Sequence, residues 1–152
     1  MATRSTIALE YADGTVGQIY AHWDGYLDHN GKILYEHYTD PYKVRELMDL
    51  GDVSSLHPNI GKKHSFDDRS ACDGQCTFYG RDRGEEGCDQ RMFKDFEDYV
   101  ANHQYEEYEY ILRRDGIWYV QCYSTNSKYL PLGEAIAEEL RRKHEEEQEA
   151  LF

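Results

Sequence analysis

The chain has 152 residues, a length that suits one domain, and 39% of them are apolar. Acidic residues outnumber basic ones by 30 to 17, and the formal net charge of −13 disfavours bare nucleic acid and anionic membranes as partners. No apolar run approaches the ~18 residues of a membrane span, and the N-terminal residues lack the apolar core of a signal peptide, so we expect a cytoplasmic protein.

The first predicted element is a β-hairpin over residues 5–26 that turns at Asp13-Gly14. Asp-Gly favours a two-residue type I′ turn, which would pair Leu9 with Gln18. Since side chains alternate along a strand, this register predicts two mixed faces. One face holds Ile7, Leu9, Tyr11, Val16 and Tyr20, and the other holds Ala8, Ile19, Ala21 and Trp23.

Two short helices are predicted next, at residues 32–38 and 42–50. Asp40 suits the N-cap of the second helix, Pro41 suits its first position, and Gly51 suits its end. The inward residues of this second helix are expected to be Val44, Leu47 and Met48.

Residues 52–75 show little periodicity and predict a long surface loop. A short strand at residues 76–81 and a charged, glycine-rich turn at residues 82–90 follow. Residues 93–103 have the spacing of an amphipathic helix. Its apolar side would carry Phe93, Phe96, Tyr99 and Val100.

A second β-hairpin is predicted over residues 105–123, where a two-residue turn at Asp115-Gly116 would pair Leu112 with Tyr119. The more apolar of its two faces is expected to be core, although the reverse assignment stays open because tyrosine is also a core residue. The expected core face holds Glu107, Glu109, Ile111, Trp118, Val120 and Cys122, and the other holds Tyr108, Tyr110, Leu112, Ile117, Tyr119 and Tyr123.

Residues 132–149 predict a final helix that is apolar only in its first half, at Leu132, Ile136 and Leu140. Residues 141–152 are then a charged helical tail that projects into solvent or against a partner. The whole chain, residues 1–152, is predicted to be a single α+β domain. Two antiparallel β-hairpins plus a short strand would form one sheet, with helices packed on one face.

The chain contains four cysteines, three of which cluster with a histidine in the sequence. A zinc site needs four soft ligands in a tetrahedron, and the candidates are His64, Cys72, Cys76 and Cys88. Their spacing matches no standard zinc motif, so free thiols are favoured and no cofactor is predicted. The alternative is a small zinc-dependent or cysteine-based enzyme, with Arg81 and Arg83 holding an anion.

The segment Asp95–Tyr110 carries carboxylates with no Lys or Arg among them, interleaved with tyrosines. Such a surface imitates the phosphates of a nucleic acid and suits a basic protein groove, where tyrosines add apolar anchors. A solvated face over core tyrosines is the competing interpretation. The predicted partner-binding residues are Asp95, Glu97, Asp98, Tyr105, Glu106, Glu107, Tyr108 and Glu109.

Three stretches of the sequence resemble a group of small bacteriophage and prophage accessory proteins. They are RSTIALEYADGTVGQIYAHWDGY (Arg4–Tyr26), LMDLGDVSSL (Leu47–Leu56) and FYGRDRGEE (Phe78–Glu86). The resemblance implies an accessory phage protein that acts inside a bacterial cell, where such proteins bind and block host enzymes or defence complexes.

Together these observations predict a non-enzymatic inhibitor whose acidic, aromatic surface occupies the basic groove of a host nucleic-acid-binding protein. A CRISPR or restriction component of the host is the expected kind of target. Besides the enzyme alternative, an adaptor that forms a homodimer through its C-terminal helix remains open.

Overall fold

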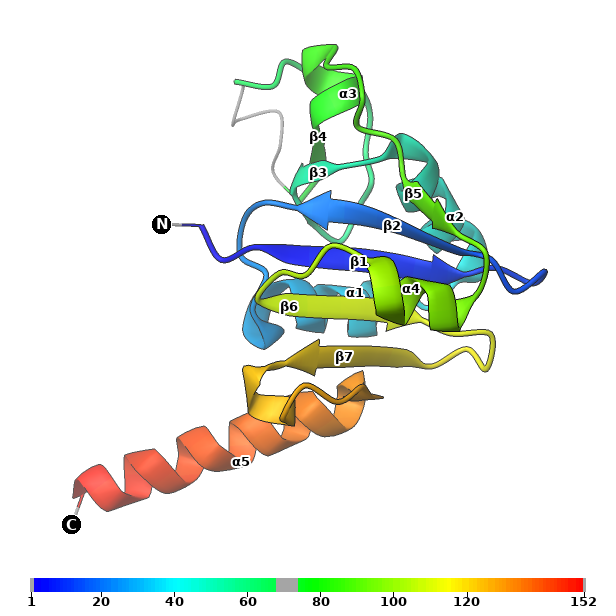
Figure 1. Cartoon of the computed structure of the whole chain (residues 1–152). Coiled ribbons are helices and arrows are strands. Elements are labelled where there is room, and N and C mark those ends of the chain that lie inside the picture. Colours follow the sequence, from blue (N-terminus) through cyan, green and yellow to red (C-terminus); the bar gives the residue numbers. More distant parts are fainter. Residues whose placement is uncertain (1, 68–73, 152) are drawn as a thin grey trace.

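The computed structural model describes residues 2–67 and 74–151. Within them, eight strands form one mixed sheet in the order β4-β3-β2-β1-β6-β7-β8, and β5 also pairs with β2 (Figure 1). The strands are β1 (Ser5–Glu10), β2 (Val16–Ala21), β3 (Val53–Ser55), β4 (Thr77–Phe78), β5 (Arg91–Phe93), β6 (Tyr108–Leu112), β7 (Trp118–Cys122) and β8 (Leu130–Pro131). The α-helices are α1 (Lys32–His37), α2 (Pro41–Leu50), α3 (Tyr79–Arg83), α4 (Phe96–Asn102) and α5 (Leu132–Leu151).

The α+β class and the two antiparallel hairpins in one sheet are confirmed. The hairpins β1–β2 and β6–β7 meet through a parallel pairing of β1 with β6 at the centre of the sheet. Because β1 and β6 run in the same direction, the turns of both hairpins lie at the same end of the sheet (Figure 1).

Both hairpins are one residue out of the predicted register. Glu10 pairs with Val16 in the first, and Leu112 pairs with Trp118 in the second. The reason is the turn, because in each Asp-Gly pair only the glycine has a positive φ, and a type I′ turn requires two. Each turn is therefore a three-residue loop that ends in a glycine bulge.

The aspartate side chain holds each of these turns in place. In the first turn, Asp13 Oδ1 accepts hydrogen bonds from the backbone N (3.0 Å) and Oγ1 (2.6 Å) of Thr15. Asp115 Oδ1 accepts from Ile117 N at 2.9 Å in the second. This local bond to the residue two positions on is typical of aspartate in turns, and it does not need a positive φ at the aspartate.

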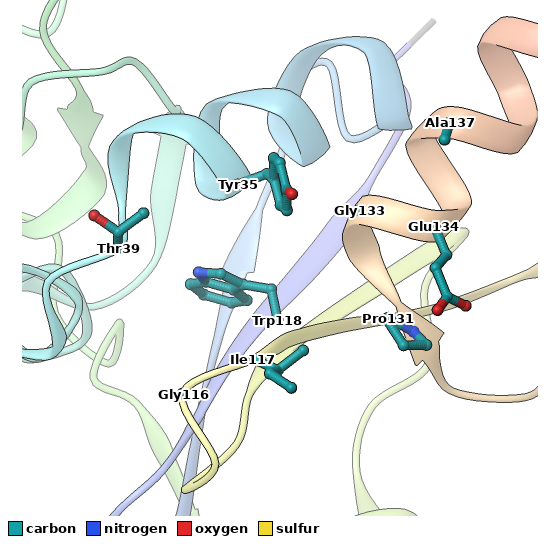
Figure 2. Close-up of a pocket in the computed structure, with 9 residues that line it drawn as sticks. All are labelled: Tyr35, Thr39, Gly116, Ile117, Trp118, Pro131, Gly133, Glu134 and Ala137. Atoms are coloured by element: carbon teal, nitrogen blue, oxygen red, sulfur yellow. The ribbon is translucent and has the colours of Figure 1, made fainter.

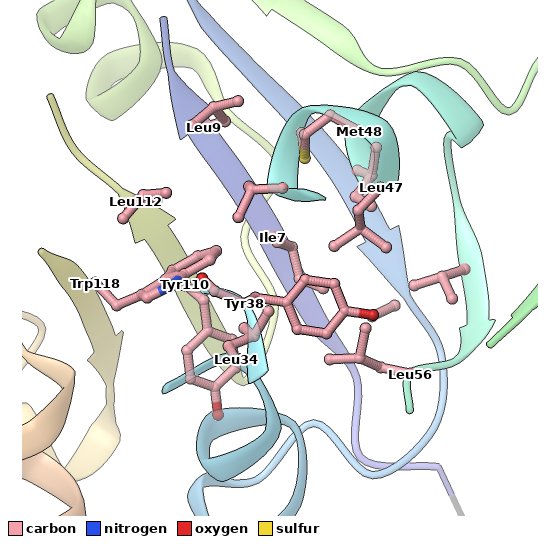
Figure 3. Close-up of a cluster of buried hydrophobic side chains, with 14 of the residues drawn as sticks. Ile7, Leu9, Leu34, Tyr38, Leu47, Met48, Leu56, Tyr110, Leu112 and Trp118 are labelled. Carbon is pink, nitrogen blue, oxygen red and sulfur yellow. Dashed lines mark hydrogen bonds between the residues drawn. The ribbon is translucent and has the colours of Figure 1, made fainter. Parts of the chain in front are cut away.

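The main core lies on the sheet face that α1, α2 and α5 cover (Figure 3). The shifted register brings side chains from all four central strands to this face, so the faces predicted for both hairpins are wrong. Tyr110 and Leu112 join Trp118 and Val120 in this core, whereas Ile111 points to the opposite side. From the first hairpin the core contains Ile7, Leu9, Ile19 and Ala21.

A smaller cluster lies on the opposite face, where α4 packs in front of the sheet (Figure 1). The prediction that helices pack on one face is therefore wrong for α4. Strand β5 pairs with β2 and carries the chain across to this face before α4 begins. The cluster consists of Ala8, Val16, Tyr99 and Ile111, with Phe93, Phe96, Tyr119 and Tyr129 at its margin.

Helix α2 has the N-cap and the buried residues that the sequence predicts. Asp40 Oδ1 accepts a hydrogen bond from Tyr42 N at 2.9 Å, which satisfies one of the free N–H groups of the first turn. Val44, Leu47 and Met48 are buried against the sheet.

Helix α5 is buried at Leu132 and 52% exposed at Leu140, and the side chains of residues 141–150 are all exposed. Within residues 2–67 and 74–151, none of the helices combines the length and the apolar composition of a membrane span.

Several short elements escaped prediction. Strands β3 and β5 have three residues each, β8 has two, and α3 occupies part of a predicted strand and turn. Elements this short span too few residues for an alternating or helical pattern to repeat.

Candidate functional site

The candidate site is the acidic belt, which we define as Asp95, Glu97, Asp98, Glu106, Glu107 and Glu109. It begins at the N-cap of α4 and ends within β6. Asp95 Oδ1 accepts a hydrogen bond from Asp98 N at 2.7 Å and so caps the helix. The start of the belt is therefore set by the N-cap of α4.

Asp98 is held in the first turn of α4. Its carboxylate accepts hydrogen bonds from the backbone N of Lys94 (3.0 Å) and from Asn102 Nδ2 (2.8 Å). These two bonds lower the pKa of Asp98 below its ordinary value. The group therefore stays ionised at neutral pH, and its negative charge is fixed in position.

Three further carboxylates of the belt point outward. Glu97 and Glu107 are exposed, and Glu106 is partly exposed and accepts a hydrogen bond from Gln104 Nε2 at 3.0 Å. Among the described residues, no Lys, Arg or His forms an ion pair with these three or with Asp95 and Asp98. Five carboxylates thus leave their charge uncompensated by a direct contact.

Glu109 does not belong to this surface, which corrects its predicted role in partner binding and leaves the belt as Asp95, Glu97, Asp98, Glu106 and Glu107. It is only 2% exposed, because β6 turns this side chain under α4. There its carboxylate meets Nε2 of the buried His103, whose Nδ1 faces the carbonyl oxygen of Tyr99. Because a carbonyl oxygen only accepts hydrogen bonds, Nδ1 of His103 carries a hydrogen. A second proton must then lie between Nε2 of His103 and the carboxylate of Glu109 to form the hydrogen bond that joins them.

The two predicted anchor tyrosines lie apart. Tyr105 is 58% exposed, its hydroxyl donates to Val100 O at 3.0 Å, and its ring packs on His103. Tyr108 lies on the other face of the sheet, half-buried beside Tyr110. The prediction of Tyr108 as an anchor within the belt is therefore wrong, because neighbouring residues of a strand point to opposite faces.

Most of the arginines that form ion pairs bind buried carboxylates and not those of the belt, although the guanidinium of Arg113 also packs on the ring of Phe96 in α4. Burial alone would raise the pKa of Glu10, but hydrogen bonds from the Arg113 side chain and the Arg114 backbone bring it below its ordinary value. Unpaired buried charges are costly, which explains why arginines are placed there. The pairs with buried carboxylates are Glu10 with Arg113 and Arg114, Asp52 with Arg91, and Asp82 with Arg81.

Among the described residues, the zinc candidates His64, Cys76 and Cys88 do not form a metal site. Cys72 lies outside the described residues, and within those residues no three His, Cys, Asp or Glu side chains gather around a common point. Cys76 is buried, with its Sγ 3.4 Å from the hydroxyl of Tyr38 and 3.3 Å from His57 N. Cys88 lies near the surface and bonds instead to Glu86 O.

The predicted alternative of a cysteine nucleophile finds little support in this geometry. Burial raises the pKa of both Cys76 and Cys88, whereas a nucleophilic cysteine needs a lowered one. The guanidinium of Arg81 is occupied by Asp82 (3.0 Å) and by the carbonyl oxygen of Cys76 (2.9 Å). Arg81 is therefore a structural residue in this fold.

A second surface feature was not predicted from the sequence. A cleft of about 510 Å³ opens between α1, the β6–β7 turn and the first turns of α5 (Figure 2). Its floor is Trp118, a residue of the main core, so the cleft lies on the sheet face opposite to α4. Its walls come from three separate parts of the chain, so no periodic pattern in the sequence could predict the cleft.

No protein-family model, curated protein or solved structure matches this chain. The resemblance to phage accessory proteins therefore stays a prediction.

Proposed function

We propose that this protein is a non-enzymatic inhibitor whose acidic belt occupies the basic, nucleic-acid-binding groove of another protein. The observation that carries the proposal is the set of five carboxylates that form no ion pair among the described residues, three of which point outward. Asp95, Glu97, Asp98, Glu106 and Glu107 supply the charge, and Tyr105 is the aromatic anchor.

The distribution of charge supports this role. The chain carries a net charge of −13, and several of its arginines are engaged by the buried carboxylates of Glu10, Asp52 and Asp82. The carboxylates of the belt therefore form no ion pair with these arginines, and their negative charge attracts a basic surface and speeds the encounter between the two proteins. An acidic surface that is neutralised by its own arginines would have neither property.

Part of the belt is held on regular structure, since Asp95, Glu97 and Asp98 lie at the N-cap and in the first turn of α4. Tyr99 is fully buried beneath α4, Asp95 caps the helix, and His103 joins its end to Glu109 of β6. The carboxylates of Asp95 and Asp98, which hydrogen bonds hold in place, lose little conformational entropy on binding, and this favours affinity.

We further propose the cellular setting implied by the resemblance to phage accessory proteins. A phage-encoded inhibitor would act in the cytoplasm of the bacterial host, against a defence or processing protein such as a CRISPR or restriction component. It would bind the groove in place of nucleic acid and would not itself bind DNA, RNA or membranes.

A capture experiment with a competitor tests the proposal. Tagged protein is incubated with bacterial lysate, and bound proteins are eluted with short duplex DNA at constant salt. We expect the eluted protein to bind nucleic acid itself and to be captured less efficiently as salt increases. The triple variant Glu97→Gln, Glu106→Gln, Glu107→Gln is expected to lose the capture while keeping its thermal stability.

A matched control separates local charge from total charge. The variant Glu146→Gln, Glu147→Gln, Glu149→Gln removes three charges from the exposed end of α5 and leaves the belt intact. We expect this control to capture the same protein as the wild type. Equal losses in both triple variants, or a captured protein that duplex DNA does not release, would refute the proposal.

A further inference from the structure

The cleft on the opposite face of the sheet has the size and the walls of a ligand site. Its volume of about 510 Å³ falls within the range of roughly 300–1,000 Å³ that small-molecule pockets occupy. Two aromatic rings face it, the floor residue Trp118 and the half-exposed wall residue Tyr35 (Figure 2). The remaining apolar wall is formed by Ile117, Pro131 and Ala137.

The polar edge of Trp118 is already used within the fold. Its indole N–H donates to Tyr38 O at 2.9 Å, so the ring offers the cleft an apolar surface without a free donor. Gly133 at the start of α5 allows the ring of Tyr35 to approach the helix, because a Cβ there would lie 2.9 Å from Tyr35 Cε1. The aromatic walls are thus positioned by α1 and α5 together.

One charge borders this apolar space, the carboxylate of Glu134 in the first turn of α5. The N-terminal end of a long helix stabilises a negative charge at this position. Within the described residues no Lys or Arg forms an ion pair with Glu134, in contrast to Glu138 and Glu145 on the same helix, which both pair with Arg141. The cleft therefore combines aromatic walls with a single uncompensated negative charge.

We infer that this cleft binds a small organic cation, an amine or guanidinium carried on a flat apolar body. The apolar part lies between Trp118 and Tyr35, where aromatic faces also attract a cation. The cationic head lies at Glu134, the one charged group at the rim. A neutral ligand would leave this carboxylate unpaired, and an anionic ligand would be repelled by it.

Three probes of the same shape test the charge preference: 3-phenylpropylamine, 3-phenylpropan-1-ol and 3-phenylpropionate. The chain has two tryptophans, so the variant Trp23→Phe leaves Trp118 as the single indole signal in an ¹H–¹⁵N NMR spectrum. We expect the amine to shift this signal saturably, with a dissociation constant on the order of 1 mM for a ligand of this size. The alcohol and the acid are expected to bind about threefold more weakly or worse, as loss of a partly exposed ion pair implies.

Variants then assign the site. Glu134→Gln is expected to remove the preference for the amine, whereas Glu147→Gln, on the same helix but outside the cleft, keeps it. Ala137→Leu introduces a good helix former at an exposed position and fills the cleft, so it is expected to weaken all three probes.

Three results would overturn the inference: no saturable shift with the amine, equal binding of the alcohol or the acid, or an unchanged amine preference in Glu134→Gln. Because the acidic belt lies on the other face of the sheet, none of these results bears on the proposed inhibitor function.

Discussion

Replacing Glu109 by alanine tests whether the buried pair of Glu109 and His103 holds α4 against the sheet. Both side chains are almost completely buried, and the pair connects the end of α4 to β6. Alanine leaves Nε2 of His103 without a partner in an apolar setting beneath Tyr99 and Tyr105. The variant therefore loses the pair, and the unsatisfied buried nitrogen that remains lowers the stability of the folded protein.

The expected cost follows from this geometry. Removing one partner of a buried ion pair destabilises a protein by about 3–5 kcal/mol. For a chain of 152 residues, each kcal/mol lowers the melting temperature by roughly 2–4 °C, so we expect a decrease of about 6–20 °C. Glu109→Gln should cost less, because the amide still donates a hydrogen bond to Nε2 while Nδ1–H bonds to Tyr99 O.

Urea unfolding followed by circular dichroism measures the free energy of unfolding for each variant. Glu107→Ala is the matched control, since Glu107 lies two positions earlier but is exposed, and its loss should change stability by about 0.5 kcal/mol or less. If Glu109→Ala cost no more than Glu107→Ala, the pair would not hold α4.

Three other predictions concern the rest of the fold. Asp40→Ala removes the cap of α2 and should lower the free energy of unfolding by about 0.5–2 kcal/mol in urea titrations, whereas Asp40→Asn should be nearly neutral. Hydrogen bonds from arginines hold the pKa of Glu10 below its ordinary value in the folded protein. The unfolded chain therefore takes up a proton at Glu10 more readily than the folded chain. The contribution of Glu10 to the free energy of unfolding is thus lost as the pH falls below about 4.3. Glu10→Gln should therefore flatten the acid limb of stability measured against pH, and an unchanged limb would contradict this. Truncation after Leu140 removes residues 141–150, whose side chains are all exposed, and should shift the melting temperature by no more than a few degrees; a larger loss would mean that this tail is part of the folded core.

The sequence predicted the fold class well because its strongest local signals are independent of tertiary structure. Asp40-Pro41 and Gly51 bound α2 through backbone chemistry alone, and the two Asp-Gly turns mark the hairpins. Their register was wrong for a physical reason, since Asp-Gly fits both a two-residue and a three-residue loop. One added residue in the loop then exchanged the two faces of each following strand.

The acidic belt was predicted from composition, but its membership depends on contacts that no local pattern encodes. Glu109 is buried because α4 crosses to the second face of the sheet and brings His103 over it. Tyr108, one position earlier, is removed from the belt by the alternation of the strand itself. The cleft at Trp118 could not be predicted, because its walls meet only when α1, α5 and the β6–β7 turn are packed.

The central sheet makes the two proposed sites independent in energy as well as in place. In β6, Glu109 and Ile111 face α4, whereas Tyr108 and Tyr110 face the core beneath α1 and α5. No side chain can serve both surfaces, so changes in the belt and changes at Glu134 share no partner. Effects of mutations that share no partner add to within about 0.3–0.5 kcal/mol. The belt triple variant combined with Glu134→Gln should therefore lose partner capture as much as the belt variant alone, and amine preference as much as Glu134→Gln alone. A coupling energy above about 0.5 kcal/mol between the two sets of changes would show that the sheet transmits a change from one face to the other.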